Sequence, residues 1–120
     1  MKLITVVNAH NAIESFFDND ALGAHIAYWM TKFVVKTQPD ADFFNSELKK
    51  LFDKYGVVEG DETIIKPDKV KDFNDELEKL QAMEAEDPGI RFSLSELTNE
   101  IKISMKQMYP LLEFIEEDVK

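Results

Sequence analysis

The chain has 120 residues, of which 44% are hydrophobic and 32% charged, and this composition is typical of one globular domain rather than of a disordered segment. Its formal net charge of −10 argues against direct binding to nucleic acid, because the phosphate backbone is bound by clustered Lys and Arg. The absence of Cys excludes disulfides and thiolate chemistry and is compatible with a reducing cytoplasm.

Neither a secretory signal nor a membrane span is expected. The apolar run before Asn8 is too short for a signal peptide. The longest mostly apolar run, residues 21–35, contains His25 and Lys32 and is also too short to cross a bilayer. These features predict a soluble intracellular protein without membrane association.

The N-terminal part is predicted to contain a strand and a helix. Residues 2–7 are rich in β-branched side chains, which favours a short strand. Asn8 is a suitable N-cap for a helix over residues 9–17, with Ile13, Phe16 and Phe17 on its apolar side. The run Asp18-Asn19-Asp20 is expected to end this helix.

Residues 20–56 are predicted to form two consecutive helices. Asp20 is the expected cap of the first, whose buried stripe includes Trp29 and Phe33. Pro39 disfavours helical geometry at Gln38 and suits the first turn of a second helix, although one kinked helix is the alternative. Gly56 is expected to end this segment as a left-handed C-cap.

A hairpin and a further helix follow. Residues 57–58 and 63–65 flank a turn and suggest a small hairpin that leans on the helices. Lys66-Pro67-Asp68 predicts a helix start, and Val70, Phe73, Leu77 and Leu80 form its apolar stripe. Asp87-Pro88-Gly89 predicts a turn.

The last third is predicted to hold two strands and a helix. Ile90, Phe92 and Leu94 alternate with polar residues, and Ile101 and Ile103 do the same, which indicates two half-buried strands. Ser104 and Gln107 form a capping box for a last helix, which Pro110 should kink or delay. Its expected apolar stripe consists of Met105, Met108, Leu112, Ile115 and Val119. Residues 1–120 are thus predicted to be a single α+β domain of four to five amphipathic helices with a small sheet of short strands.

No group of residues predicts catalysis. His10 and Glu14 would share a helical face as a surface pair, but a zinc site needs three or four ligands. His25 is expected to pack, partly buried, on Trp29. Most acids fall on the polar faces of amphipathic helices, where solvation is the simplest explanation. We therefore expect no enzyme, no catalytic residue, no metal site and no cofactor. An enzyme would require that folding gathers distant acids and a histidine into one pocket.

The surplus of aromatic residues suggests a protein-binding surface. Phe43 and Phe44 are adjacent and point about 100° apart on a helix, so one of each adjacent Phe pair is expected to be exposed. Alternatively, other elements could cover the helices on two sides and bury all of these aromatic side chains, and this explanation fits equally well. The candidate partner-binding residues are Phe16, Phe17, Trp29 and Phe43.

Acidic side chains form a second candidate surface. They gather at residues 59–62, 84–87 and 113–118, and together they could imitate a phosphate track. An ordinary acidic protein would show the same clusters, because Lys and Arg are interleaved with them. The candidate acidic residues are Glu84, Glu86, Asp87, Glu113, Glu116 and Glu117.

Three segments together resemble small proteins of unknown function from tailed phages and prophages: Leu51-Phe52-Asp53-Lys54-Tyr55-Gly56, Asp72-Phe73-Asn74-Asp75-Glu76-Leu77 and Ile101-Lys102-Ile103-Ser104. The resemblance spans residues 8–117. It implies a phage gene whose product acts in the cytoplasm of a bacterial host or in the virion. No catalytic residue is carried over from this family.

Two hypotheses follow. The first is a non-catalytic protein–protein interaction protein that acts in virion structure or assembly, with a phage or host protein, or further copies of itself, as its partner. The alternative is an acidic inhibitor that imitates nucleic acid and binds a host defence or nucleic-acid-binding protein.

Overall fold

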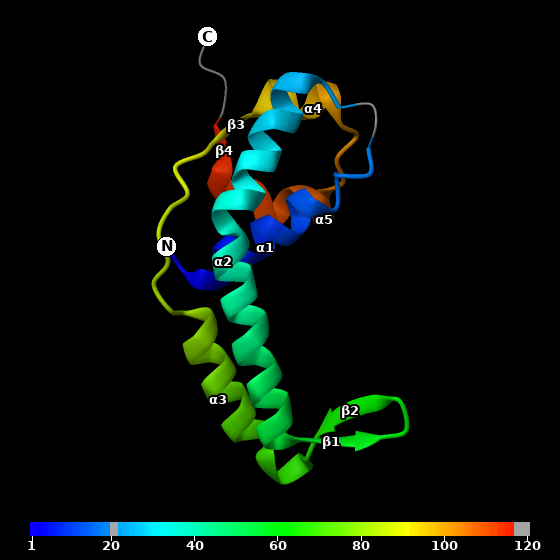
Figure 1. The fold of residues 1–120 in the computed structure, drawn as a ribbon, viewed down its shortest axis with the longest axis vertical. Helices are drawn as coiled ribbons and strands as arrows, with labels where there is room; N and C mark the ends of the chain where they lie inside the picture. The colour runs from blue at the N-terminus through cyan, green and yellow to red at the C-terminus, as the bar shows by residue number, and fades with distance from the viewer. Residues whose placement is uncertain (20–21, 117–120) are drawn as a thin grey trace.

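The structure is a computed structural model that describes residues 1–19 and 22–116. Over these residues the α+β class is confirmed: five α-helices are accompanied by short strands. The strands form two separate two-stranded sheets, one antiparallel and one parallel. Helix α2 runs the length of the molecule, with most of the other elements gathered at its two ends (Figure 1).

The first element is helix α1 (Leu3–Glu14), so the predicted strand at residues 2–7 is wrong. Leu3, Val6, Val7, His10 and Ile13 are buried, and their spacing of three and four is that of a helical face. The strand preference of β-branched residues is weak and is overridden here by packing. The predicted cap residue Asn8 lies inside this helix.

Helix α2 (Ala24–Tyr55) is one helix of 32 residues that contains Pro39, so the single-helix alternative is correct. Pro39 has no N–H for the carbonyl of Val35, and both residues are exposed, where water can replace that bond. The expected cap Asp20 lies outside the described residues, and Gly23 is the N-cap. Gly56 has φ −93° and ψ 159°, so it is extended rather than left-handed, because the chain continues directly into a strand.

The predicted hairpin and the helix after it are confirmed. Strands β1 (Gly56–Glu59) and β2 (Glu62–Ile65) pair antiparallel, and Gly60 at the turn has φ +62°. The 3-10 turn η1 (Pro67–Lys69) then leads into helix α3 (Val70–Gln81). Helix α3 packs on the C-terminal half of α2, where the Phe73 and Phe52 ring centroids are 5.3 Å apart.

The last third differs from the prediction. Strand β3 (Phe92–Ser93) is short, and helix α4 (Leu94–Glu100) begins at Leu94, with the Ser93 side chain as its cap. Residues 101–104 are not a strand. The capping box of Ser104 and Gln107 is confirmed at helix α5 (Met105–Met108).

After α5 the chain forms the 3-10 helix η2 (Tyr109–Phe114) and strand β4 (Ile115–Glu116), which pairs parallel with β3. Pro110 lies in the first turn of η2. Because a 3-10 helix has three residues per turn, Leu111 and Phe114 share its buried side. The predicted stripe is therefore wrong: Met105 and Leu112 are exposed, and Val119 lies outside the described residues.

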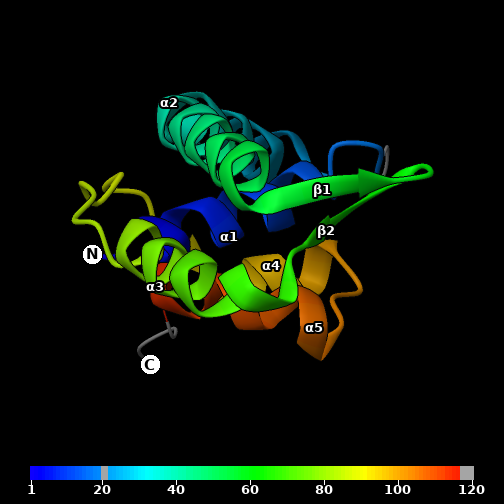
Figure 2. The same cartoon turned by 90° about the horizontal axis from the view of Figure 1, so that it is seen from below.

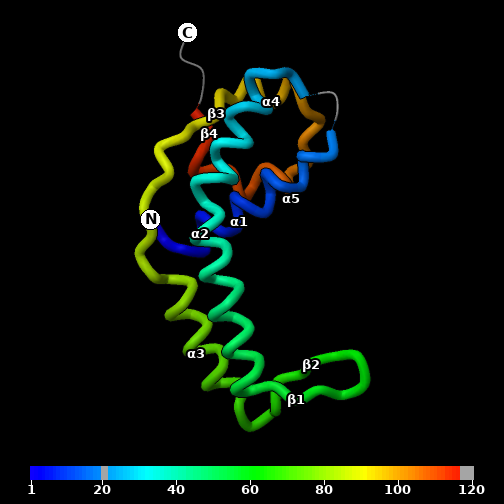
Figure 3. Tube along the Cα trace, viewed as in Figure 1, coloured from blue at the N-terminus to red at the C-terminus, as the bar shows by residue number. Residues whose placement is uncertain are grey.

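The core has two parts. The larger part lies where α1, α4 and η2 meet α2, around Phe33, whose ring centroid is 5.8 Å from that of Phe92 and 5.0 Å from that of Phe114. The smaller part joins α1 to the α2–α3 pair. The N-terminus lies beside the segment that follows α3 (Figure 3), where the N–H of Leu3 donates to the carbonyl of Met83 over 2.7 Å.

The described chain is elongated. Its extents are 54 × 31 × 24 Å and its radius of gyration is 17.0 Å, against about 13.6 Å for a compact domain of this length. The hairpin projects sideways from the end of α2 that carries α3 (Figure 1). Seen from below, the other helices all lie on one side of α2 (Figure 2). Within residues 1–19 and 22–116, one long face of α2 is therefore left without a covering helix.

Candidate protein-interaction surface

The uncovered side of α2 carries apolar side chains. Its inner side is buried and includes Ile26, Met30, Phe33 and Thr37. On the opposite side Val35 is 67% exposed, Tyr28 54%, Phe43 43% and Trp29 37%. Apolar side chains that gather on one exposed surface mark binding sites more often than scattered ones do. We call this surface the outer face of α2, and it is the candidate site.

Three of the four aromatic residues predicted to bind a partner are exposed. Phe17 is exposed, but its neighbour Phe16 is buried at 4% exposure, because it belongs to the larger core. Phe43 is likewise exposed while Phe44 is buried. The expectation that one of each adjacent pair is exposed is confirmed, and the inclusion of Phe16 among exposed binding residues is wrong.

At the N-terminal half of the outer face, Tyr28, Trp29 and Lys32 form a cluster. The two rings pack edge to face with centroids 5.4 Å apart. The Lys32 ammonium lies 5.3 Å from the Tyr28 centroid and 5.7 Å from the Trp29 centroid. Such cation–π contacts hold large side chains in fixed positions at modest energy when exposed. This half of the face therefore presents a preformed aromatic surface.

Toward its C-terminal half the outer face borders a groove between α2 and α3. The groove has a volume of about 290 Å³. Its apolar lining consists of Phe43, Leu51, Leu80 and Met83. Phe43 and Met83 are exposed to solvent. Glu47, Glu76 and Lys79 complete the wall. The groove is large enough for an apolar side chain of a partner.

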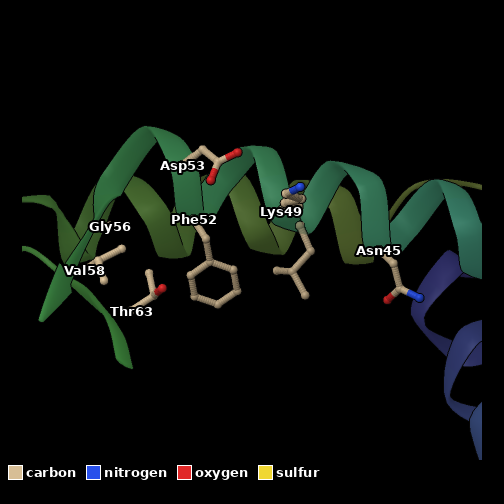
Figure 4. Close-up of a pocket in the computed structure, with 8 residues that line it drawn as sticks. Asn45, Lys49, Phe52, Asp53, Gly56, Val58 and Thr63 are labelled. Carbon is tan, nitrogen blue, oxygen red and sulfur yellow. The ribbon is translucent and has the colours of Figure 1, made fainter. Parts of the chain in front are cut away.

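A larger hollow lies on another side of α2, against the hairpin (Figure 4). It has a volume of about 640 Å³, and Phe52 and Val58 contribute apolar surface to it. Asn45, Lys49, Asp53 and Thr63 add polar groups. The labelled side chains are spread along the helix and hairpin rather than converging on one point (Figure 4). This hollow is an open groove with mixed apolar and polar walls.

The predicted acidic residues are partly brought together. The hydrogen bond from Arg91 to Asp87, together with the negative charges of Glu116 and Glu113, raises the pKa of the Arg91 guanidinium. The hydrogen bonds from Arg91, and then from the backbone N–H of Gly89, lower the pKa of Asp87 to about 2. Glu84 pairs with the N-terminal ammonium.

The acidic residues in the described part of the chain do not form one continuous track. Residues 59–62 lie on the hairpin, far from β3 and β4 at the opposite end of the molecule (Figure 1). Glu86 lines a hollow that also contains Lys36. Glu117 lies outside the described residues. The acids that do converge are thus partly neutralised by basic groups.

Both histidines lie in surroundings that differ from the prediction. His10 is buried rather than on the surface, because it packs between α1 and α2, where its Nδ1 is 2.8 Å from Thr37 Oγ1. His25 is exposed, and its Nδ1 contacts Glu96 on α4 instead of packing on Trp29. Among residues 1–19 and 22–116, no group of three or more His, Cys, Asp or Glu side chains is arranged to hold a metal ion.

A polar contact joins α2 to α3 near the hairpin. Hydrogen bonds from the Tyr55 hydroxyl and from Lys54 lower the pKa of Glu76 on α3. The Lys54 Nζ lies 3.2 Å from Glu76 Oε1. All three groups are at the surface, so this contact orients α3 but forms no enclosed site.

No helix in the described part of the chain is long and apolar enough to cross a bilayer.

Comparison of the chain with protein-family models, with curated proteins and with solved structures found no match, so the resemblance to phage proteins stays a prediction.

Tyr28, Val35 and Met83 are exposed apolar residues that were not predicted from the sequence. A signal for the first two was present. Tyr28, Lys32, Val35 and Pro39 repeat at steps of four, three and four, which is a second helical stripe on the side opposite the buried one. Helix periodicity could not predict the exposure of Met83, because this residue lies after the end of α3. Its place beside the groove is set by how α3 packs on α2.

Proposed function

We propose that this chain is a non-catalytic protein–protein interaction protein that binds its partner through the outer face of α2. One observation carries the proposal: a helix of 32 residues has all the other helices on one side and exposes Tyr28, Val35 and Phe43 on the other. A partner helix or sheet laid on this face would remove these side chains from water. At about 25 cal/mol per Å² of apolar surface, that burial favours association.

The proposed biological setting rests on the resemblance to phage proteins. In this setting the chain is phage-encoded, acts in virion structure or assembly, and binds a phage or host protein. The elongated shape supports binding along α2, because this helix runs the length of a molecule that extends over 54 Å.

The alternative, an acidic inhibitor that imitates nucleic acid, has less support. A mimic needs negative charges at regular spacing along one surface. Here the acids near Arg91 are partly neutralised, and those of the hairpin lie at the other end of the molecule. The net charge of −10 by itself fits solubility equally well.

A site-specific crosslinking experiment tests the proposal. A photoreactive amino acid is placed at Val35 on the outer face and, as a matched control, at Lys71, which is exposed on α3. The two full-length variants are irradiated in the cells that produce the protein. We expect protein adducts from position 35 in high yield and few or none from position 71.

The adducts are identified by mass spectrometry. A second copy of the chain, a phage protein or a host protein at position 35 would each support an interaction role for this face. Equal yields at positions 35 and 71, or no adduct at position 35, would contradict it. Replacing Tyr28 and Phe43 together by Ala should reduce the yield at position 35 without changing the helical content of the protein.

A further inference from the structure

The outer face of α2 has the spacing of a coiled-coil contact. Tyr28, Lys32, Val35, Pro39, Asp42 and Ser46 follow one another at steps of four and three, and every one of them is exposed. These steps match alternating d and a positions of the heptad repeat. We call these residues the α2 seam. Its contact length is about 27 Å at 1.5 Å of rise per residue.

We propose that the α2 seam binds the α2 seam of a second copy of this chain, antiparallel, about a two-fold axis that crosses the outer face of α2 midway between Val35 and Pro39. The proposal rests on the function proposed above and names its partner. The axis places Val35 opposite Pro39 of the second copy, and Tyr28 opposite Ser46 of the second copy. In antiparallel coiled coils d residues face a residues in this way.

The order of charges along the seam selects the antiparallel orientation. Lys32 lies in its N-terminal half and Asp42 in its C-terminal half. In a parallel pair, Lys32 would face Lys32 and Asp42 would face Asp42, which is unfavourable. In the antiparallel pair, each Lys32 faces Asp42 of the other copy, so two opposite-charge contacts form. The sequence is thus complementary to itself in one orientation only.

Both charged groups are available for such a contact. Within the part of the chain that the structure describes, neither Lys32 nor Asp42 makes an ion pair. Lys32 lies over the Tyr28 and Trp29 rings, and the Asp42 carboxylate accepts a hydrogen bond from Gln38 over 2.9 Å. Both interactions keep the side chains on the outer side of α2.

The neighbouring Lys36 is engaged elsewhere, although it lies near the proposed axis. Its ammonium donates to the carbonyl of Pro88 over 3.1 Å, and it lines a hollow with Asp40, Glu86 and Asp87. This contact holds the Lys36 ammonium toward the segment that follows α3 in its own chain. Lys36 therefore does not prevent the two seams from meeting.

The flanks of the seam also match. Trp29 and Phe43 each follow a d position, on the same side of the seam. In the antiparallel pair, Trp29 of the second copy lies opposite Phe43, at the groove between α2 and α3. One arrangement thus covers Tyr28, Trp29, Val35 and Phe43, the exposed large apolar residues of α2. A contact of this length is shorter than most obligate interfaces, so we expect a reversible dimer.

Charge exchange tests the proposal with the full chain. The mass in solution is measured by analytical ultracentrifugation for the wild type, Lys32→Asp and Asp42→Lys. The wild type should reach twice the monomer mass of 13.9 kDa as its concentration rises. Each single variant should lose the dimer, because like charges then meet at both ends of the seam. Lys71→Asp makes the same change of charge on α3 and should dimerise as the wild type does.

Mixing the two variants gives the decisive result. In a mixed pair, the carboxylate at position 32 of one chain meets Lys at position 42 of the other, and the native Asp42 and Lys32 meet at the other end. An equimolar mixture should therefore recover the dimer that neither variant forms alone. A wild type that stays monomeric, or a mixture that stays monomeric, would overturn the proposal.

The two proposals fail in different ways. A monomeric wild type whose position 35 still crosslinks to another protein would overturn the self-association but leave the interaction role in place. A wild type that is monomeric and gives no adduct at position 35 would overturn both. Circular dichroism of each variant shows whether helix content is kept, which is expected because Lys32 and Asp42 are exposed.

Discussion

The Nδ1 atom of His10 on α1 lies 2.8 Å from the hydroxyl oxygen of Thr37 on α2, and both side chains are buried. Thr37 donates its own proton to the carbonyl of Phe33 over 2.7 Å. Its oxygen therefore accepts from His10, which places a proton on Nδ1. This polar contact joins α1 to α2 within an otherwise apolar interface.

Replacing Thr37 by Val keeps the shape of the side chain and removes this acceptor. His10 would then hold a buried N–H without its partner, which should destabilise the fold by about 1–3 kcal/mol. Thr37→Ser keeps the hydroxyl and is the matched control, with a smaller loss. Urea unfolding followed by circular dichroism measures both. Equal losses for Val and Ser would show that the hydrogen bond does not stabilise the contact.

Phe114 and Leu112 should differ sharply in their effect on stability. Phe114 is fully buried against Phe33, whereas Leu112 is 55% exposed. Phe114→Ala should lower the free energy of unfolding by about 3–5 kcal/mol, and Leu112→Ala by less than about 0.5 kcal/mol. The same unfolding experiment compares them. A larger loss for Leu112→Ala would favour a regular α-helix over residues 104–119 instead of the 3-10 helix η2.

Pro39→Ala should stabilise the protein. Pro39 lies inside α2 at an exposed position and leaves the Val35 carbonyl without its helical N–H. Ala restores that bond, and after allowance for the greater freedom of the unfolded chain we expect a gain of about 2 kcal/mol. Ser46→Ala, on the same side of α2, should change stability by only a few tenths of a kcal/mol and serves as the control. A loss of stability on replacing Pro39 would mean that the proline ring makes a contact that Ala cannot.

Asp87 should make the stability depend on pH in acid. Arg91, and then the Gly89 N–H, lower the pKa of Asp87 from its ordinary value of 3.8 to about 2. Because the folded pKa is the lower one, the stabilisation is fully present above about pH 4 and is lost as the pH falls through about 2. Its size should be under about 1 kcal/mol, since the pair is partly exposed to solvent. The difference in unfolding free energy between the wild type and Asp87→Asn, measured from pH 5 downward, should shrink to zero over this window.

A constant difference across this range of pH would contradict the role of the Asp87 carboxylate. The unfolding curves need a control for general acid effects. Glu59→Gln removes an exposed carboxylate on the hairpin, so its difference from the wild type should vary less over the same window.

The parts of the fold that depend on neighbouring residues were predicted best. The hairpin, the Pro67 start of the helix that packs on α2, and the Ser104 capping box each depend on residues within one turn of each other. Their backbone conformations are favoured by local hydrogen bonds and by the restricted angles of Pro and Gly. The exposure of one Phe in each adjacent pair followed in the same way from helix geometry.

The errors fall where a distant contact decides between two local conformations. Residues 3–7 have side chains that suit a strand, but they form a helix because it buries Leu3, Val6 and Val7 against other elements. Alternation predicted one strand through Leu94 and a second over residues 101–103. Instead Leu94 begins helix α4, and the short strand β3 pairs with β4, which lies later in the chain.

For the site, the sequence by itself determined which large apolar and charged residues lie on each side of α2, because helix periodicity depends only on their spacing. It could not determine that one of those sides is uncovered. Only the tertiary structure placed the other helices on the opposite side of α2, and so separated the buried stripe of Met30 and Phe33 from the exposed stripe of Tyr28 and Val35. The exposed stripe also carries Lys32 and Asp42, and burial of the apolar side chains depends on which stripe finds a partner within the same chain.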